Sequence, residues 1–412
     1  MGYTAVKGGA EAIAAAERLL QELKLELDER RVEVRQVLSQ LHASVDKVMA
    51  EGGVYAPDLA ALAILQTEGD LMEAAFTLRA YRSTLPRLGY SLPVTDKQMR
   101  VMRRISSAFR DVPGGQLLGR TRDYTQRLFD FTVIGEQQDT PLDDEGVDFP
   151  EPENNHTDTG RSPWDLPKVA DAMRAMGVME PLPDKKDTEP FDITRESLRF
   201  PASRSAWLQA LARGESGALL ALAYSSIRGF GGIANHGTIA ELRSGDLPLQ
   251  VMHPLTGEPA TIGFFRVTSV EMTGNERSTE ATGGKLAKYG LSYGIVFGQE
   301  ERKAIAMALL DSTLQAQAPI EGEPPPAADQ EMVLYHSDGV ESLGFIEHLK
   351  LPHFVTFGSS LQTTLERKQD APPATAEPAR QPNDESTPHS HDGGLTTHAH
   401  GPAEMVGAES SR

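Results

Sequence analysis

The stretch ATIGFFRVTSVEMT, residues 260–273, decides the fold class. It is rich in Val, Ile, Phe and Thr, a composition typical of a β-strand. Two further segments of this kind lie at 248–253 and 291–298, and a helical pattern covers 299–315. Because these strands do not alternate regularly with helices, a doubly wound parallel sheet is disfavoured. We therefore predict an α+β fold with a central, mainly antiparallel or mixed sheet.

The sequence before the sheet is rich in helical patterns. Apolar residues recur at helical spacing through 10–50, and further helices are predicted at 57–66, 70–84 and 96–110. Residues 203–225 are also expected to be mostly helical. The N-terminal half is therefore predicted to be helix-rich, and the mixed region follows it.

Two segments have compositions that do not build a core. Residues 136–158 hold nine acidic residues and no basic one, and the C-terminal segment is rich in Pro, Ala, Ser, Thr and His. The predicted organisation is a helix-rich N-terminal domain (1–135), an acidic disordered insertion (136–160), a mixed α/β region (161–322), a C-terminal unit (329–366) and a disordered, His-containing tail (367–412).

Composition excludes several kinds of protein. The chain of 412 residues contains no Cys, so it has no disulfide, no cysteine nucleophile and no iron–sulfur cluster of its own. Its net charge of −19 argues against a general nucleic-acid binder, because phosphate contacts need clustered Lys and Arg. No apolar run reaches the roughly 18 residues that a transmembrane helix requires. Without a signal-peptide pattern either, we expect a cytoplasmic protein.

Several arginines are candidates for binding an anion. Arg79 and Arg82 are three residues apart, on one face of a predicted helix. Arg120 and Arg127 follow the glycine-rich segment GGQLLG (114–119), which has two interpretations: a phosphate-binding loop, or a tight turn with surface arginines. Arg228 follows a predicted helix. The chain has no Walker A sequence, so any nucleotide site here lacks the common phosphate cradle.

Two histidines flank a proline near the end of the predicted ordered region. His348 and His353 lie five residues apart in HLKLPH, so they share neither a helix face nor a strand face. A turn at Pro352 can bring the imidazoles together, and two imidazoles suit zinc but leave further ligands to be found. The alternative is two unrelated histidines on the surface or in the core.

An ordered set of short segments resembles one known family. The set comprises AVKGG (5–9), VMAEGG (48–53), RAYR (79–82), PGGQLLG (113–119), LAYS (222–225), ERKA (301–304) with MAL (307–309), and HLKLPH (348–353). In this order the chain resembles PhnI, the I subunit of the bacterial carbon–phosphorus lyase core complex. The acidic insertion and the sequence after residue 366 lie outside the resemblance.

The resemblance implies a cytoplasmic subunit that acts in alkylphosphonate breakdown with PhnG, PhnH, PhnJ, PhnK and PhnL. Together with partner subunits it displaces adenine from ATP by methylphosphonate, which gives α-D-ribose 1-methylphosphonate 5-triphosphate. Alone it acts as a purine nucleosidase on ATP or GTP. The iron–sulfur cluster belongs to PhnJ, in agreement with the absence of Cys here. The resemblance also implies a zinc ion bound by His348 and His353.

Displacement at the ribose C1′ passes through a state with oxocarbenium character. It needs a group that protonates the purine or stabilises the sugar, and cations that hold the triphosphate. Asp123 is the candidate acid or stabilising carboxylate. The candidate triphosphate ligands are Arg79, Arg82, Arg120, Arg127 and Arg228. The competing hypothesis is a scaffold subunit that organises the complex and contributes an interface metal site.

Overall fold

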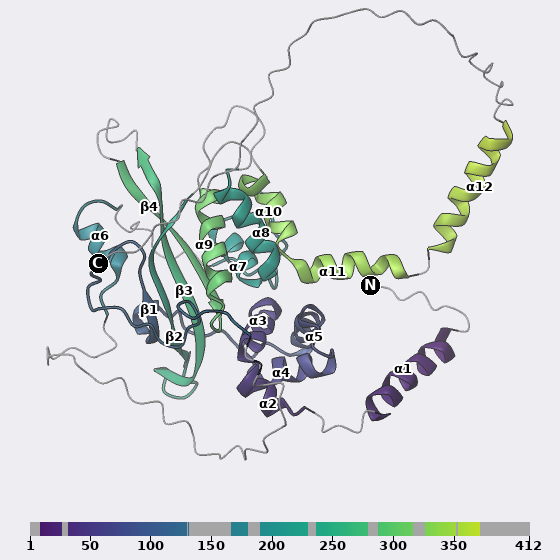
Figure 1. Ribbon diagram of the computed structural model, residues 1–412, viewed down its shortest axis with the longest axis horizontal. Helices are drawn as coiled ribbons and strands as arrows, with labels where there is room; N and C mark the ends of the chain where they lie inside the picture. The colour runs from purple at the N-terminus through teal and green to yellow at the C-terminus, as the bar shows by residue number, and fades with distance from the viewer. Residues whose placement is uncertain are drawn as a thin grey trace, which may run out of the picture. The chain divides into compact units, whose positions relative to one another are not determined.

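The computed structural model has an α+β fold, as predicted, with helices and a four-stranded antiparallel sheet among its described residues (Figure 1). The chain divides into two compact units, Met1–Leu351 and Pro352–Arg412. The predicted insertion at 136–160 lies outside the described residues, and so does the predicted tail beyond Asp370. The structure describes residues 9–26, 32–129, 131, 166–179, 190–229, 236–278, 287–315, 326–351 and 353–370.

The N-terminal part is helical, as predicted. Its helices are α1 (Gly9–Glu26), α2 (Val34–Gln40), α3 (His42–Gly52), α4 (Pro57–Gln66) and α5 (Leu71–Thr84). Asp70 begins α5 because its carboxylate accepts hydrogen bonds from two backbone N–H groups of the first turn. Gly53 ends α3 in the left-handed conformation, with φ of 65°. Val48, Ile64 and Leu78 are buried in the core between these helices.

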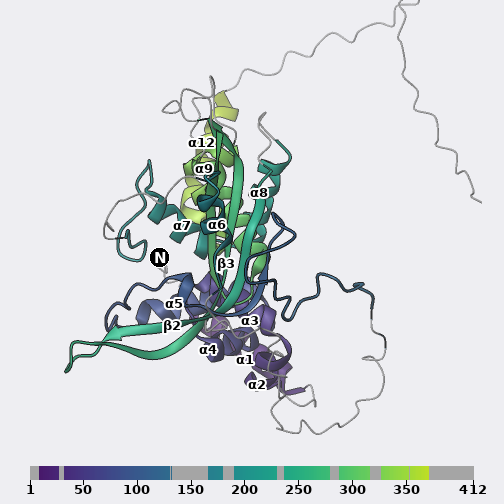
Figure 2. The ribbon, with the colours of Figure 1, turned by 90° about the vertical axis from the view of Figure 1, so that its left-hand side faces the viewer.

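The sheet consists of long antiparallel strands in chain order. They are β1 (Arg100–Ile105), β2 (Thr238–Met252), β3 (Pro259–Ser278) and β4 (Ala287–Phe297). Figure 2 shows β2 and β3 continuing together as a hairpin arm beyond the other strands. The predicted strand at 260–273 lies within β3, and the one at 291–298 matches β4 to within one residue at its end; the one at 248–253 covers only the end of β2, which begins ten residues earlier.

The helix predicted over 96–110 is wrong. A 3₁₀ turn, η1 (Asp96–Gln98), leads instead into β1, which pairs with β2. Met99 and Val101 are buried, whereas Arg100 and Met102 between and after them are exposed, which is the two-residue period of a strand. Because the pairing partner lies far along the chain, the local sequence does not reveal it. The predicted N-terminal domain thus contributes an edge strand to the sheet.

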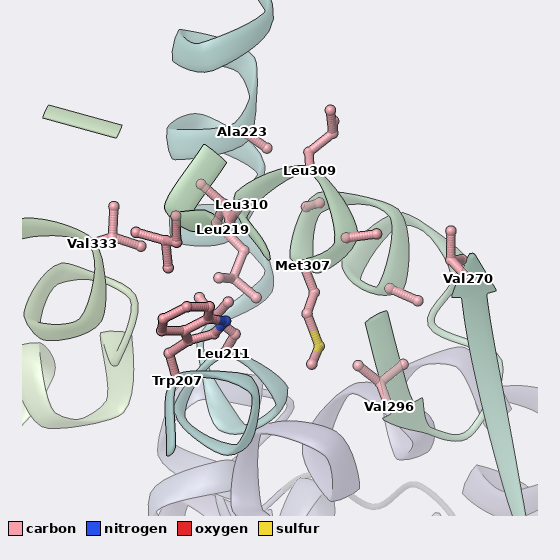
Figure 3. Packing of buried hydrophobic residues seen from close by; sticks show 14 of the residues in the cluster. Trp207, Leu211, Leu219, Ala223, Val270, Val296, Met307, Leu309, Leu310 and Val333 are labelled. Carbon is pink, nitrogen blue, oxygen red and sulfur yellow. The ribbon is translucent and has the colours of Figure 1, made fainter. Parts of the chain in front are cut away.

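Helix α9 (Glu301–Gln315) packs along one face of the sheet (Figure 1). Gly294 of β4 permits this close approach, because a Cβ there would lie 2.1 Å from the carbonyl oxygen of Ala304. On the other side of α9 lie α7 (Arg204–Arg213), α8 (Ser216–Ile227) and α10 (Gln330–His336). Figure 3 shows Trp207, Leu219 and Met307 within the main core cluster.

Residues 203–225, expected to be mostly helical, form two helices with a break between them. Gly214 passes close to another segment, since a Cβ there would lie 3.0 Å from the carbonyl oxygen of Ser337. Glu215 then caps α8 by accepting hydrogen bonds from two backbone N–H groups. The remaining elements are α6 (Val169–Ala175), η4 (Pro326–Ala328), α11 (Gly339–Glu347), η5 (His348–Lys350) and α12 (Phe354–Asp370).

Asp311 connects the helices to the sheet. Its carboxylate is fully buried on α9 and accepts hydrogen bonds from Arg204 at 2.6 Å and from the Trp207 indole at 2.8 Å. It also accepts the backbone N–H of Tyr293 at 2.8 Å, so α7, α9 and β4 meet at one charge. The donors compensate the cost of burying the carboxylate, and they become unpaired if it is removed.

Asp311→Ala should lower the free energy of unfolding by about 3–5 kcal/mol, because it leaves Arg204 without its partner and two buried N–H groups unsatisfied. Urea denaturation followed by circular dichroism measures this loss. The control is Asp58→Ala, which removes an exposed carboxylate from the first turn of α4 and should cost no more than about 1 kcal/mol. Equal losses in the two variants would contradict the role given to Asp311.

Candidate functional site

Three arginines surround the glycine turn that ends α3. Arg79 and Arg82 come from α5, and Arg213 is the last residue of α7. A Cβ added to Gly53 would lie 3.4 Å from Arg213 Cδ and 3.8 Å from Arg82 Nη1. We call Arg79, Arg82 and Arg213 the arginine cluster. The absence of a side chain at Gly53 leaves space directly beside two of its members.

Arg79 holds the cluster together. One terminal nitrogen donates to both carboxylate oxygens of Asp338, at 2.8 and 2.9 Å. The other terminal nitrogen donates to the backbone carbonyls of Glu51, at 2.7 Å, and Arg213, at 3.3 Å. These bonds engage both terminal nitrogens, so Arg79 mainly fixes the turn and the end of α7.

Arg82 is the member that is ready for an anion. Its half-buried guanidinium makes no hydrogen bond or ion pair with any residue the structure describes. Burial lowers the pKa of Arg82, and repulsion from Arg87 lowers it further, although Asp192 acts in the opposite direction. The carboxylate of Asp192 already forms an ion pair with Arg87, with 2.8 Å between Arg87 Nη1 and Asp192 Oδ2. The positive charge of Arg82 is therefore only weakly compensated.

Arg213 also lacks a close counter-ion. Its nearest carboxylate oxygen, on Asp338, lies 3.7 Å away and already accepts from Arg79. The pKa of Arg213 is lowered by burial first and then by repulsion from Arg79. Among the described residues, Asp338 is thus the one carboxylate within 4 Å of any of the three guanidinium groups, and it contacts two of them. Such an excess of positive charge in partly buried surroundings suits an anionic ligand.

Asp123 lies against a buried arginine outside the arginine cluster. Its carboxylate is 2.5 Å from Arg103, a fully buried residue of β1 that also pairs with Glu301 at 2.6 Å. The Asp123 side chain is 45% exposed and therefore accessible to a substrate. Burial raises the pKa of Glu301, with Arg103 acting in the opposite direction. Asp123 and Glu301 thus pair with the same guanidinium, that of Arg103, and Asp123 is the more exposed of the two.

The glycine-rich segment before Asp123 is fastened to β1. Arg104 donates to the carbonyls of Pro113, at 2.7 Å, and Gly115, at 2.8 Å. Gly119 has φ of 59°, and a Cβ there would lie 2.6 Å from the carbonyl oxygen of Met102. These contacts fit the tight-turn interpretation of 114–119, because the glycines allow close packing against the strand.

The other predicted arginines are dispersed. Arg120 and Arg127 lie on the exposed segment after the glycine turn. Arg228 follows α8 and lies over the ring of Tyr224, 5.9 Å from its centroid. The length of α8, about 18 Å at 1.5 Å per residue, separates Arg228 from Arg213 near the start of that helix. Of the five predicted arginines, the structure brings only Arg79 and Arg82 to one turn.

The two predicted metal ligands flank the boundary between the compact units. His348 begins η5, and its Nδ1 contacts the carbonyl oxygen of Phe345. His353 precedes α12, where its carbonyl accepts the N–H of Phe357 at 2.9 Å. Among the described residues there is no group of three or more His, Asp or Glu side chains that could hold a metal ion.

Sequence reasoning missed Arg213, Glu51 and Lys303. Glu51 and Lys303 are fully buried beside the arginine cluster, and Glu51 accepts a hydrogen bond from Lys47 at 2.5 Å. A signal for Arg213 exists, because Gly214 next to it marks a helix end. Burial of the two charged residues depends on tertiary packing and has no local signature.

Asp338→Asn should lower the free energy of unfolding by about 2–3 kcal/mol, because it removes the charge that Arg79 binds through two hydrogen bonds. Asn still caps α11, so the loss reports on the ion pair rather than the helix end. Urea denaturation measures it against Glu347→Gln, which breaks an exposed pair with Lys350 and should cost less than about 1 kcal/mol. A loss no larger than in this control would contradict the clamp assigned to Arg79.

Comparisons with known proteins agree with the resemblance. The family described as "Bacterial phosphonate metabolism protein (PhnI)" matches residues 2–371. The "Putative C-P lyase subunit protein HtxH" of Stutzerimonas stutzeri is 44% identical over 92% of this chain and 99% of its own length. Proteins named "Alpha-D-ribose 1-methylphosphonate 5-triphosphate synthase subunit PhnI" are 42% identical in Rhizobium meliloti (strain 1021), over 90% of this chain and 96% of the relative. The protein of that name in Escherichia coli (strain K12) is 41% identical over 89% of this chain and 99% of its own length.

No single described helix has the length and apolar composition to cross a membrane. The predicted resemblance is confirmed: the chain belongs to the PhnI family of bacterial phosphonate metabolism proteins.

Proposed function

We propose that this chain, with partner subunits, displaces adenine from ATP by methylphosphonate and forms α-D-ribose 1-methylphosphonate 5-triphosphate. Without partners it hydrolyses ATP or GTP to the free base and ribose 5-triphosphate. The observation that carries the proposal is the weakly compensated positive charge of Arg82 and Arg213 beside Gly53. A triphosphate is the anion that these substrates and the product have in common.

The arginine cluster binds the triphosphate and thereby orients the ribose. Arg82 and Arg213 donate charge-assisted hydrogen bonds to phosphate oxygens, while Arg79 keeps the turn at Gly53 in position. Fixing one end of the nucleotide reduces the entropy lost when the phosphonate oxygen attacks C1′. Arg120, Arg127 and Arg228 remain candidates for the phosphonate or for a nucleotide that reaches beyond the cluster.

Asp123 supplies the carboxylate chemistry at the sugar. It is partly exposed and pairs with Arg103, so it suits stabilisation of the positively charged ribose. Glu301 shares the same arginine, and burial raises its pKa against the opposing effect of Arg103, so of the two carboxyl groups it is the candidate proton donor to the departing purine. The pair follows the division of roles found in glycoside chemistry, with one acid and one stabilising carboxylate.

The chain acts as one subunit of a larger cytoplasmic assembly with PhnG, PhnH, PhnJ, PhnK and PhnL. Exposed apolar side chains on α11 and after it favour such contacts, among them Phe345 (71% exposed), Ile346 (63%) and Leu349 (64%). The names of the similar proteins describe subunits, in agreement with this part of the proposal. The scaffold alternative differs in one respect only: a partner then supplies the groups that react at the ribose.

The proposal includes a zinc ion bound by His348 and His353. The contact between His348 Nδ1 and the Phe345 carbonyl suits the tautomer that carries its lone pair on Nε2, the usual arrangement behind a zinc-bound imidazole. Zinc needs more than two ligands, so a partner subunit or water completes the set. The ion would supply a Lewis acid beside the two histidines.

Arg82→Ala should weaken ATP binding by about tenfold to 100-fold, because it removes a charge-assisted contact to the triphosphate. Chromatography of the products from ATP and methylphosphonate, with the partner subunits present, should show the change in KM for ATP. Arg35→Ala is the control: Arg35 is exposed and pairs with Glu33, so turnover should stay unchanged. An unchanged KM in Arg82→Ala would remove the arginine cluster from the triphosphate site.

A pair of glycine variants provides a second, matched comparison. Gly53 and Gly69 both have positive φ, so Gly→Ala should cost each of them about 1 kcal/mol or somewhat more in stability. A Cβ at Gly69 meets nothing within 4 Å, whereas a Cβ at Gly53 reaches Arg213 and Arg82. Only Gly53→Ala should therefore raise the KM for ATP. Equal KM values in the two variants would argue against ligand binding at this turn.

His348→Ala and His353→Ala should each reduce the zinc content of the purified complex from near one ion per chain to a small fraction of it, since each variant removes a ligand. Elemental analysis by mass spectrometry measures this directly. His253→Ala, in the turn between β2 and β3, is the matched control and should retain the wild-type zinc content. Full zinc occupancy in both test variants would exclude this pair as ligands.

A further inference from the structure

Lys303 is a buried cation that the proposed chemistry does not use. It lies in the first turn of α9 and is fully buried. Its ammonium nitrogen makes no hydrogen bond or close ion pair with any described residue. An ammonium group in such surroundings is expensive to bury, and an apolar side chain of similar size would avoid that cost. The position therefore calls for a role in which the charge itself matters.

The charged groups that act on Lys303 come from α3, from α5 and from the residue before α9. Glu51 and Lys47 lie on α3, Arg79 on α5, and Glu300 immediately before α9; all four interact electrostatically with Lys303. Glu51 is the largest of these influences and is itself fully buried. Burial raises the pKa of Glu300. Lys303 thus lies among two carboxylates and two other cationic side chains that are buried or partly buried.

Glu51 links this group to the arginine cluster. Its Oε1 accepts hydrogen bonds from Lys47 and from the backbone and hydroxyl of Ser216, at 2.5, 2.9 and 2.8 Å. Its Oε2 is buried without a partner among the described residues, as is Arg79 Nε. Its backbone carbonyl accepts from Arg79. The side chain of Glu51 therefore interacts electrostatically with Lys303, and its backbone carbonyl binds Arg79.

We propose that Lys303 is a positioning residue for the arginine cluster: its unpartnered buried ammonium compensates the charge of the buried Glu51 carboxylate, whose Oε2 also lacks a partner among the described residues, and its positive charge sets how well the cluster binds a triphosphate. The inference rests on the proposed function, because the ligand is the triphosphate. Two effects act in the same direction. The ammonium adds positive potential at the site, and through Glu51 it keeps the carbonyl that Arg79 binds in place.

The direction of the pH dependence follows from the titration of Lys303. Burial lowers its pKa to about 8, with Glu51 and Glu300 opposing the shift. As pH rises from 7 to 9, the ammonium loses its proton, so the site loses a positive charge and affinity for the triphosphate falls. Lys303→Met lacks this titration, and Lys303→Arg keeps a positive charge throughout the interval.

The experiment measures binding of inorganic tripolyphosphate to the full-length chain by calorimetry between pH 7 and pH 9. Lys303→Met should bind at least fivefold more weakly than wild type at pH 7, and the difference should shrink to less than twofold at pH 9. Lys350→Met, an exposed lysine paired with Glu347, should follow wild type at each pH. Taking ratios at each pH cancels the titration of the probe itself.

Lys303→Arg provides the test if Lys303→Met does not fold. Its affinity relative to Lys350→Met should rise several-fold from pH 7 to pH 9, since only the arginine keeps its charge. If the affinity of Lys303→Arg relative to Lys350→Met stays constant between pH 7 and pH 9, the role of Lys303 is overturned. In that case, loss of binding in Arg82→Ala would still support the arginine cluster as the triphosphate site. If the wild-type chain binds no tripolyphosphate at any pH, the arginine cluster is not the triphosphate site, and the proposal for Lys303 fails with it.

Discussion

The arrangement of the arginine cluster depends on the hydrogen bonds that the buried carboxylate of Glu51 accepts. A charge without access to water must be compensated by groups held at fixed positions, and here these come from α3 itself and from Ser216 at the start of α8. The same residue offers its carbonyl to Arg79. The helical N-terminal part and the helices behind α9 are thereby joined at the residue that precedes the Gly52-Gly53 turn.

The fold brings together basic residues that are far apart in the sequence, so positive charge is concentrated in a small region beside Gly53. Arg82 and Arg213 are held near Gly53 with little compensation, because Asp338 already binds Arg79. Phosphate groups need such fixed donors when no Walker A loop is present. The proposed triphosphate site therefore depends on packing between helices that are distant in the sequence.

The sequence predicted what has a local signature and missed what depends on distant contacts. The α+β class, the N-terminal helices and the strands of the hairpin follow from periodicity and composition. The local sequence of β1 predicts a helix instead, because the strand it pairs with, β2, lies more than a hundred residues away. The site has the same character: Glu51 and Ser216 are 165 residues apart, and Arg79 and Asp338 are 259 apart. No spacing rule reveals such pairs, so the burial of Glu51 and Lys303 could not be recognised from their sequence neighbours.

The most direct test of the triphosphate site is a structure, by cryo-electron microscopy, of the chain with its partner subunits and a slowly reacting ATP analogue. We predict phosphate oxygens within hydrogen-bonding distance of both Arg82 and Arg213, next to Gly53. A triphosphate bound at Arg120 and Arg127, at Arg228, or entirely by partner subunits would contradict it. The same map would show whether the carboxylates of Asp123 and Glu301 face the ribose.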